Sequence, residues 1–259
     1  MRAMQRQRMQ WMRNMAVRDN RTLDAIVHGT TTTTNAMLER RIARIGLITT
    51  RGFRDVLELG RRTRPTPYGL KGRFTPLIDR ELRFEVDERV DADGNVLVPL
   101  DEVQVKAAAR ALLAAGAESI VIHFLHSYIN PAHEARAAAI VRALWPNPYV
   151  TAGHTIVAEY REYERGTTAA VNAAIQPVLH RYIARLQNEL AGRGFTRELL
   201  VMQGNGGTVA ASIVAEHAVN TVMSGPASGV IAAAATALQA GRAAGDARGE
   251  FTNLVTYDM

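Results

Sequence analysis

Short apolar runs alternate along the chain with longer, alanine-rich stretches in which apolar residues recur at helical spacing. The apolar runs predict buried strands, at residues 25–27, 43–50, 118–127, 147–156 and 198–203. The alanine-rich stretches predict helices, at residues 100–116, 130–146, 163–192 and 225–240. Strands and helices that alternate in this way are typical of an α/β fold whose sheet is covered by helices.

Residues with capping and turn preferences mark several boundaries. Asp101 is suited to be the N-cap, and Gly116 the C-cap, of the helix between them. Two short stretches, 83–90 and 95–100, flank Asp93-Gly94, a dipeptide that favours a β-hairpin.

The composition limits the class of protein and the partners that we expect. A chain of 259 residues with 47% hydrophobic residues is long enough for one large domain or two smaller ones. The net charge is +6, but residues 1–24 contain six arginines and two aspartates, so most of the excess lies there. The remainder is nearly neutral, so no nucleic-acid partner is expected. Residues 1–20 predict an amphipathic helix with an arginine-coated face, with a partner-binding or RNA-binding helix as the alternative.

The residue types that are missing exclude several kinds of chemistry. The chain has no cysteine, so disulfides, thiolate nucleophiles and cysteine-ligated zinc are excluded. No apolar run reaches the roughly 18 residues of a membrane span, and no secretory signal is recognisable, so we expect a cytoplasmic protein without membrane contact. His123 and His126 are three residues apart in a predicted strand and face opposite sides, which favours structural roles over a metal site.

The most unusual stretch is "HGTTTTTNA", residues 28–36, between a predicted strand and the helical sequence that follows. A loop at this point directs hydroxyls and backbone amides to the end of the sheet where ligands of α/β proteins bind. Threonines are also good strand formers, and one of them can simply cap the helix. The local sequence leaves both interpretations open.

Three further polar stretches are candidates for a site. Residues 159–172 begin with densely spaced charges, which fit either a solvated helix face with local ion pairs or a site wall. Residues 202–208 form a glycine-rich turn after a strand, which permits close approach of a ligand to the backbone but lacks a nucleotide fingerprint. Residues 224–229 open a helix, with Ser224 as the expected cap.

Taken together, these stretches resemble the hydantoinase A/5-oxoprolinase family in order and approximate spacing, from about Asp24 to Met259. The matching stretches are "HGTTTTTNAMLER", "GLITTRGFRDVLELGRR", "FLHSYINPAHE", "EYREYERGTTAAVNAAIQP", "VMQGNGG" and "SGPASGV". The resemblance implies an actin-like ATPase or sugar kinase-like fold of the ribonuclease H-like class. It further implies that residues 1–150 are the C-terminal part of the hydantoinase/oxoprolinase N-terminal domain, and that residues 151–259 begin the hydantoinase A/oxoprolinase domain.

The resemblance also implies a function. Members of the family use ATP, with a divalent metal that we expect to be Mg²⁺, to open a cyclic amide such as 5-oxoproline or a hydantoin, or they serve as ATP-using subunits of ketone carboxylases. A hydantoinase B-like subunit or domain is the implied partner. The alternative is a noncatalytic module that binds a partner subunit without turning over nucleotide. The sequence does not distinguish the possible cyclic amides and ketones.

The family stretches supply the candidate site residues. The resemblance implies catalytic roles for six residues, namely His28, Thr31, Asn35, Arg161, Glu162 and Arg165. It implies substrate or nucleotide binding by nine others, namely Gly29, Thr30, Thr34, Asn205, Gly206, Gly207, Ser224, Gly225 and Asp258. In this scheme His28 orients the threonine loop, residues 205–207 form a backbone cradle, and Asp258 is a metal-side carboxylate.

Two phosphate loops of the family are not found in this sequence. The first is expected several tens of residues before His28, and the second is expected to continue from Asp258 and Met259. We therefore expect the chain to be an interior piece of a longer polypeptide. Within the matching stretches, Gly166 and Gly204 stand where the family has serine, and Ala174 stands where it has an aromatic residue.

Overall fold

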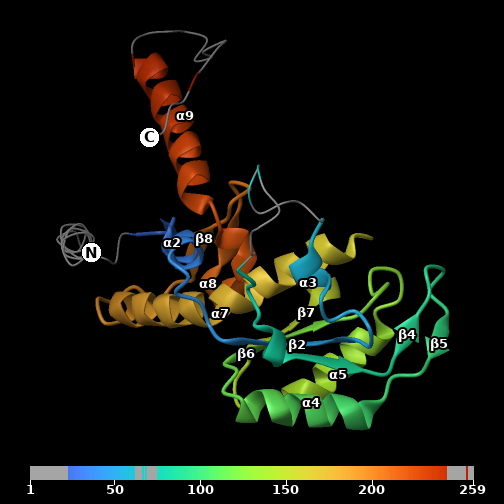
Figure 1. Ribbon diagram of the computed structural model, residues 1–259. Helices are drawn as coiled ribbons and strands as arrows, with labels where there is room; N and C mark the ends of the chain where they lie inside the picture. The colour runs from blue at the N-terminus through green and yellow to red at the C-terminus, as the bar shows by residue number, and fades with distance from the viewer. Residues whose placement is uncertain (1–22, 62–65, 67, 69–74, 244–254, 256–259) are drawn as a thin grey trace. The chain divides into compact units, whose positions relative to one another are not determined.

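The computed structural model describes residues 23–61, 66, 68, 75–243 and 255 (Figure 1). The predicted helix at residues 1–20 and Asp258 lie outside the described residues. The chain forms two compact units. The larger unit contains residues 32–179 and 215–219, and the smaller unit contains the described parts of 1–31, 180–214 and 220–259.

The larger unit is built on a parallel sheet of four strands in the order β3-β2-β6-β7. The strands are β2 (Ile45–Thr50), β3 (Arg83–Val86), β6 (Ser119–His123) and β7 (Val150–Ala152). Every residue of β2, β6 and β7 is buried, as the continuous apolar runs predicted. The parallel sheet confirms the α/β class.

Two of the predicted strands are much shorter than their apolar runs. The run at residues 118–127 forms a strand only at Ser119–His123, so His126, which we expected in this strand, lies in a turn with a φ of +57°. The strand in the run at residues 147–156 is shorter still. The chain forms a strand only at Val150–Ala152, and Gly153–Ile156 is the short helix α6. The carboxylate of Glu134 explains the early end, because it accepts hydrogen bonds from the backbone N–H of His154 at 2.6 Å and from its Nδ1 at 2.8 Å. The prediction of a strand through residue 156 was therefore wrong.

Helices cover both faces of this sheet (Figure 1). Helices α4 (Glu102–Ala114) and α5 (Ala132–Arg142) lie on one face. The first half of α7 (Glu162–Ala191) lies over the other face, with Ala169, Ala170, Ala173 and Ala174 fully buried. Two shorter helices are α2 (Thr32–Leu38) and α3 (Val56–Leu59), and the 3₁₀ turn η2 (Arg80–Leu82) precedes β3.

The predicted end signals of α4 are confirmed. The Asp101 side chain accepts hydrogen bonds from the backbone N–H groups of Val103 and Gln104, and Gly116 adopts a φ of +78° just beyond the helix. The hairpin around Asp93-Gly94 is also present, as β4 (Arg89–Val90) and β5 (Val96–Val98). The first half of the 83–90 stretch pairs with β2 instead, as β3.

The smaller unit contains a three-stranded sheet in the order β1-β8-β9. Strand β1 (Ile26–His28) pairs in parallel with β8 (Leu199–Met202), and β9 (Thr208–Ala210) is antiparallel to β8. The helices that follow are α8 (Ala211–Val214) and α9 (Ser224–Ala243), and the 3₁₀ turn η3 (Ala218–Thr221) lies where the chain passes between the units. In the part of the chain that the structure describes, no helix is long and apolar enough to cross a membrane.

Candidate functional site

The threonine run is divided between a loop and a helix. Strand β1 ends at His28, and α2 already begins at Thr32, so only residues 29–31 lie in a loop. Thr33 and Ala36, three positions apart, are buried and anchor the helix. Thr34 and Asn35, which we expected in the ligand-facing loop, are therefore helical residues.

In the smaller unit, the loop at residues 29–31 packs directly against the first turn of α9. The Ser224 hydroxyl donates a hydrogen bond to the backbone carbonyl of Thr30 at 2.9 Å. A Cβ on Gly29 would lie 2.8 Å from Ser228 Oγ, and one on Gly225 would lie 2.8 Å from Thr31 Cγ2. A side chain at either position would therefore force Ser228 or Thr31 to shift, so glycine permits this close approach. Ser224 was expected to cap α9, but its hydroxyl instead joins the helix to the loop.

The glycine-rich turn between β8 and β9 also packs against α9. Gly206 has a φ of +84°, and a Cβ there would lie 2.9 Å from Ile231 Cδ1. The N–H groups of Gly206 and Gly207 donate to Gln203 O at 3.0 Å and to Asn205 Oδ1 at 2.8 Å. Two of the amides that we expected to cradle a ligand are therefore already bonded within the turn.

Gly204 lies at the start of the same turn and is held by close packing. Its N–H donates to Asn220 O at 2.7 Å, and a Cβ would lie only 2.4 Å from Val222 O. A serine at this position would require the backbone around Val222 to shift.

His28 is the last residue of β1, and its ring packs against Tyr182. Its Nε2 lies 2.7 Å from the Tyr182 hydroxyl, and the two rings stack with their centroids 5.7 Å apart. This contact gives a physical basis for the expectation that His28 orients the loop.

These contacts define the candidate anion site of the smaller unit. Because β1 and β8 run in parallel, the loop at 29–31 and the turn at 203–207 leave the same end of the sheet. The N-terminus of α9 contacts the loop at 29–31, and Ile231, further along α9, lies against Gly206 of the turn. A helix N-terminus at the carboxyl ends of parallel strands favours phosphate. The residue types present fit a phosphate group. For a metal, the described residues contain no group of three or more His, Asp or Glu side chains that could hold one.

The larger unit contains a buried polar cluster where α7 begins. Arg165 is fully buried and donates hydrogen bonds to Glu159 O at 2.7 Å, to Phe124 O at 3.1 Å and to the Glu162 carboxylate. Glu162 also accepts from the backbone N–H of His126 at 3.1 Å, and burial raises the pKa of its carboxyl group. The solvated-face interpretation is therefore wrong for Arg165, whereas Arg161 is exposed and lies over the ring of Tyr160.

His123 extends this cluster at the end of β6. Its side chain is 3% exposed, and its Nε2 lies 3.6 Å from Glu162 Oε2. Burial lowers the pKa of the imidazole to about 4, so the ring is neutral at physiological pH. A Cβ on Gly166 would lie 2.9 Å from Nε2, and one on Gly153 would lie 3.1 Å from Nδ1. The glycine at 166, where the family has serine, thus makes room for His123.

Glu134, on α5, is a buried carboxylate that the sequence analysis missed. Burial alone would raise its pKa, but hydrogen bonds from His154 and from the backbone of Phe124 outweigh this effect and lower the pKa. A glutamate on the buried face of an otherwise alanine-rich helix was the available signal.

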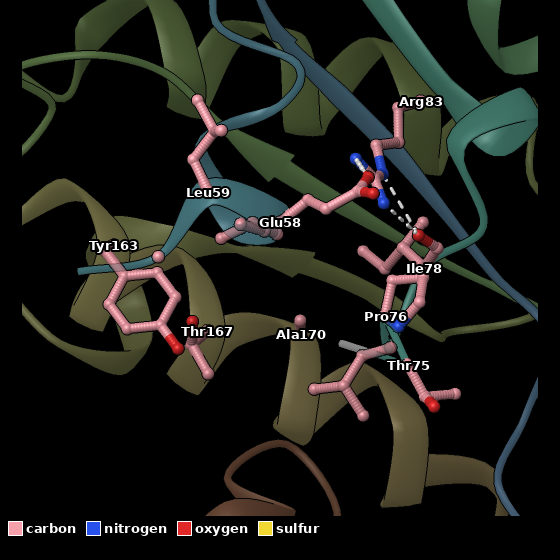
Figure 2. Close-up of a pocket in the computed structure, with 12 residues that line it drawn as sticks. Glu58, Leu59, Thr75, Pro76, Ile78, Arg83, Tyr163, Thr167 and Ala170 are labelled. Atoms are coloured by element: carbon pink, nitrogen blue, oxygen red, sulfur yellow. Dashed lines mark hydrogen bonds and ion pairs between the residues drawn. The ribbon is translucent and has the colours of Figure 1, made fainter. Parts of the chain in front are cut away.

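A pocket of about 140 Å³ in the larger unit is lined in part by residues of α7 (Figure 2). Its described lining residues are Leu57, Glu58, Leu59, Gly60, Thr75, Pro76, Leu77, Ile78, Arg83, Tyr163, Thr167 and Ala170. Its walls are mostly apolar, with Glu58 and Arg83 on one side and Tyr163 and Thr167 on the other. No residue predicted from the sequence as a site residue lines it.

Comparison with known proteins identifies the family of the chain. Residues 2–145 match the hydantoinase/oxoprolinase N-terminal region, and residues 165–245 match the hydantoinase/oxoprolinase family. The chain therefore belongs to the hydantoinase/oxoprolinase family, as the resemblance predicted.

Individual relatives agree with this assignment. The chain is 34% identical to the caprolactamase subunit alpha of Pseudomonas jessenii over 239 residues, which cover 91% of the chain and 33% of the relative. It is 33% identical to the acetophenone carboxylase gamma subunit of Aromatoleum aromaticum over 226 residues, which cover 82% of the chain and 31% of that relative. The crystal structure of the ATP-dependent caprolactamase from Pseudomonas jessenii matches with a TM-score of 0.75 and 32% identity, over 84% of the chain and 33% of that chain. The chain spans about a third of the length of these relatives.

Proposed function

We propose that the chain is the central part of an ATP-dependent enzyme that opens the ring of a cyclic amide. One observation carries the proposal: the Ser224–Thr30 hydrogen bond joins two family stretches, 194 positions apart in sequence, at the carboxyl ends of parallel strands. That arrangement suits a phosphate group. The similarity to an ATP-dependent caprolactamase supports the choice of reaction.

The proposal also covers the superfamily of the fold and the boundary between its domains. We assign the chain to the actin-like ATPase or sugar kinase-like class, with residues 1–150 and 151–259 belonging to successive family domains. The gap between the two family matches, from residue 145 to residue 165, supports a boundary there.

An unactivated lactam is a poor electrophile, so the ring must be activated before water can open it. Bound ATP with Mg²⁺ would supply a phosphoryl group for the amide oxygen, and this would make the ring carbon electrophilic enough for water to attack and for the ring C–N bond to break. In this proposal Thr31 and the backbone N–H of Gly225 bind the phosphates, and Ser224 positions the loop through the hydrogen bond from its hydroxyl to Thr30 O. His28 keeps the loop in place through Tyr182. Glu162 and Arg165, which are hydrogen-bonded to each other, are the proposed polar groups that line the site in the larger unit.

The proposed partner is a hydantoinase B-like subunit or domain. Two of the relatives are named as subunits, which supports assembly with a partner. The alternative function, a noncatalytic or carboxylase-associated subunit, is favoured by the similarity to the acetophenone carboxylase gamma subunit.

The test is an ATPase assay of the complete polypeptide with its partner, in the presence of hydantoin, 5-oxoproline or caprolactam, or of a ketone with bicarbonate. We expect phosphate release that depends on a cyclic amide. Thr31→Ala should lower this rate about tenfold or more, since one phosphate-side donor is lost. Thr236→Ala is the matched control, because this exposed hydroxyl in α9 donates only to Ala232 O, at 2.8 Å. ATP turnover that depends on the ketone alone, or that is equal in the two variants, would overturn the proposal.

A further inference from the structure

Asn172 is a fully buried polar residue in the middle of α7. The helix places it between two pairs of fully buried alanines, Ala169 with Ala170 and Ala173 with Ala174. Burying an amide side chain is unfavourable unless its N–H and C=O groups are hydrogen-bonded. The hydrogen-bond partners of Asn172 therefore indicate what this residue does.

Three hydrogen bonds satisfy the buried amide. Its Oδ1 accepts from the backbone N–H of Val219 at 3.0 Å, and its Nδ2 donates to the carbonyl oxygen of Glu216 at 3.1 Å. Nδ2 also donates to the hydroxyl oxygen of Thr151, on β7, at 3.2 Å. Because a backbone N–H can only donate and a carbonyl can only accept, the two backbone partners require both an acceptor and a donor from the same side chain.

The backbone that Asn172 binds lies where the chain crosses between the two units. Residues 215–219, the crossing segment, belong to the larger unit, whereas the chain on either side of them belongs to the smaller unit. The two bonds from Asn172 reach this segment at residues 216 and 219, close to both of its ends. Asn172 thus fixes the place at which the chain leaves the larger unit.

The residues that follow the crossing segment form part of the candidate anion site. The carbonyl oxygen of Asn220 accepts from the N–H of Gly204 at 2.7 Å, and the Ser224 hydroxyl donates to Thr30 O at 2.9 Å. Residues 220–223 separate Val219 from Ser224, and the first two of them belong to the 3₁₀ turn η3. The connection is therefore short and partly fixed in conformation, so it has little slack to absorb a shift of the crossing segment.

We propose that Asn172 is a positioning residue for the phosphate site of the smaller unit, and that it acts along the chain, through the crossing segment. This inference rests on the proposed function for the identity of the ligand. The positioning itself concerns protein contacts that exist without nucleotide, namely those of Asn220 and Ser224. When the bonds to Glu216 and Val219 are lost, the crossing segment can move, and these contacts weaken.

Hydrogen exchange of the chain without nucleotide tests the positioning. In Asn172→Ala the Val219 amide loses its acceptor, and we expect it to exchange roughly two- to tenfold faster. The Gly204 amide has no bond to Asn172, but it should also exchange faster, because its acceptor on Asn220 is no longer held in place. The Gly206 amide, which donates to Gln203 O at 3.0 Å within the same turn, should be unchanged.

Two further variants separate lost hydrogen bonds from lost packing. Asn172→Leu fills the space of the amide with an apolar side chain, and we expect the same faster exchange at Val219 and Gly204. Thr151→Val is the matched control, because it removes the third partner of the amide and leaves the bonds to the crossing segment. Unchanged exchange of Gly204 in both Asn172 variants, or equally fast exchange in Thr151→Val, would overturn the inference.

Steady-state kinetics of the complete polypeptide with its partner measure the consequence for the phosphate site. Asn172→Leu should raise the KM for ATP about three- to tenfold and leave kcat within about twofold, because nucleotide binding loses its geometry. Thr151→Val should change neither constant. An unchanged KM would mean that Asn172 supports only the fold, and would overturn the inference while the proposed function stands. If the unaltered polypeptide shows no ATP turnover, the proposed function fails, and the exchange of Gly204 still decides whether Asn172 positions this segment.

Discussion

His123 is a buried side chain whose surroundings oppose protonation. Neither ring nitrogen has a hydrogen-bond partner among the described residues, and the backbones of Gly153 and Gly166 hold the ring on both sides. Protonation would place a charge in this interior, and the cost of burying it outweighs the attraction of the nearby Glu134 carboxylate. The neutral ring therefore contributes to stability only where the imidazole stays unprotonated.

Because His123 is buried in its neutral form, we expect the stability of the fold to depend on pH. Burial lowers the pKa of His123 from 6.5 to about 4, so between these values the unfolded chain binds more protons than the folded chain. The free energy of unfolding should fall as the pH drops from 6.5 toward 4, by on the order of 1 kcal/mol per pH unit. Urea unfolding at several pH values measures this slope.

Two nearby carboxyl groups also titrate in acid, so the slope must be compared between variants. The lowered pKa of Glu134 adds to the loss of stability at low pH, whereas the raised pKa of Glu162 opposes it. His123→Leu should flatten the slope between pH 6.5 and 4. His217→Gln, at an exposed histidine, should keep it. Identical slopes in the unaltered chain and His123→Leu would contradict the assignment.

At the same scale, the sequence predicted the residue types of the candidate site better than their burial. Arg161 and Arg165 were grouped together, yet one is exposed and the other is fully buried. Which side of α7 meets the end of β6 depends on tertiary packing, and the charge pattern does not contain that information. The pocket was missed for the same reason, because its lining comes from several chain segments that meet only in the fold.

At the scale of elements, prediction succeeded where one local signal was sufficient. Strands β2 and β6 follow from continuous apolar runs, and α4 follows from its caps. The start of α2 was missed because burial of Thr33 and Ala36 overrides the weak helix propensity of threonine. The end of β7 was missed because a side chain from α5 determines it.

The cap of α4 can be tested directly. Asp101→Ala removes the acceptor for the N–H groups of Val103 and Gln104 and should lower the free energy of unfolding by about 1 kcal/mol. Asp101→Asn keeps a side-chain oxygen in the same position and should restore most of this loss. Thermal and urea unfolding of both variants measure the difference. An equal loss in both would mean that the negative charge, rather than the hydrogen bonds, stabilises the helix.

For the whole molecule, the two units differ in how their sheets are assembled along the chain. The main sheet of the larger unit is formed within residues 45–152. The smaller unit instead pairs Ile26–His28 with Leu199–Val201. The local sequence contains no information about pairing between such distant segments. It therefore predicted the two strands but not that they pair with each other. The stability of β8 should therefore depend on a segment near residue 26.

Two deletions separate this dependence from other effects of shortening the chain. Removing residues 1–31 takes away β1, whereas removing residues 1–22 leaves it in place. In hydrogen exchange, we expect the amides of β8 to lose protection in the longer deletion alone, because one of its two neighbouring strands is gone. The amides of β6 should stay protected in both, since all of its strand partners lie within the larger unit. If β8 keeps its protection without β1, the pairing with β9 is sufficient to hold it, and the loop at residues 29–31 is not needed to complete that sheet.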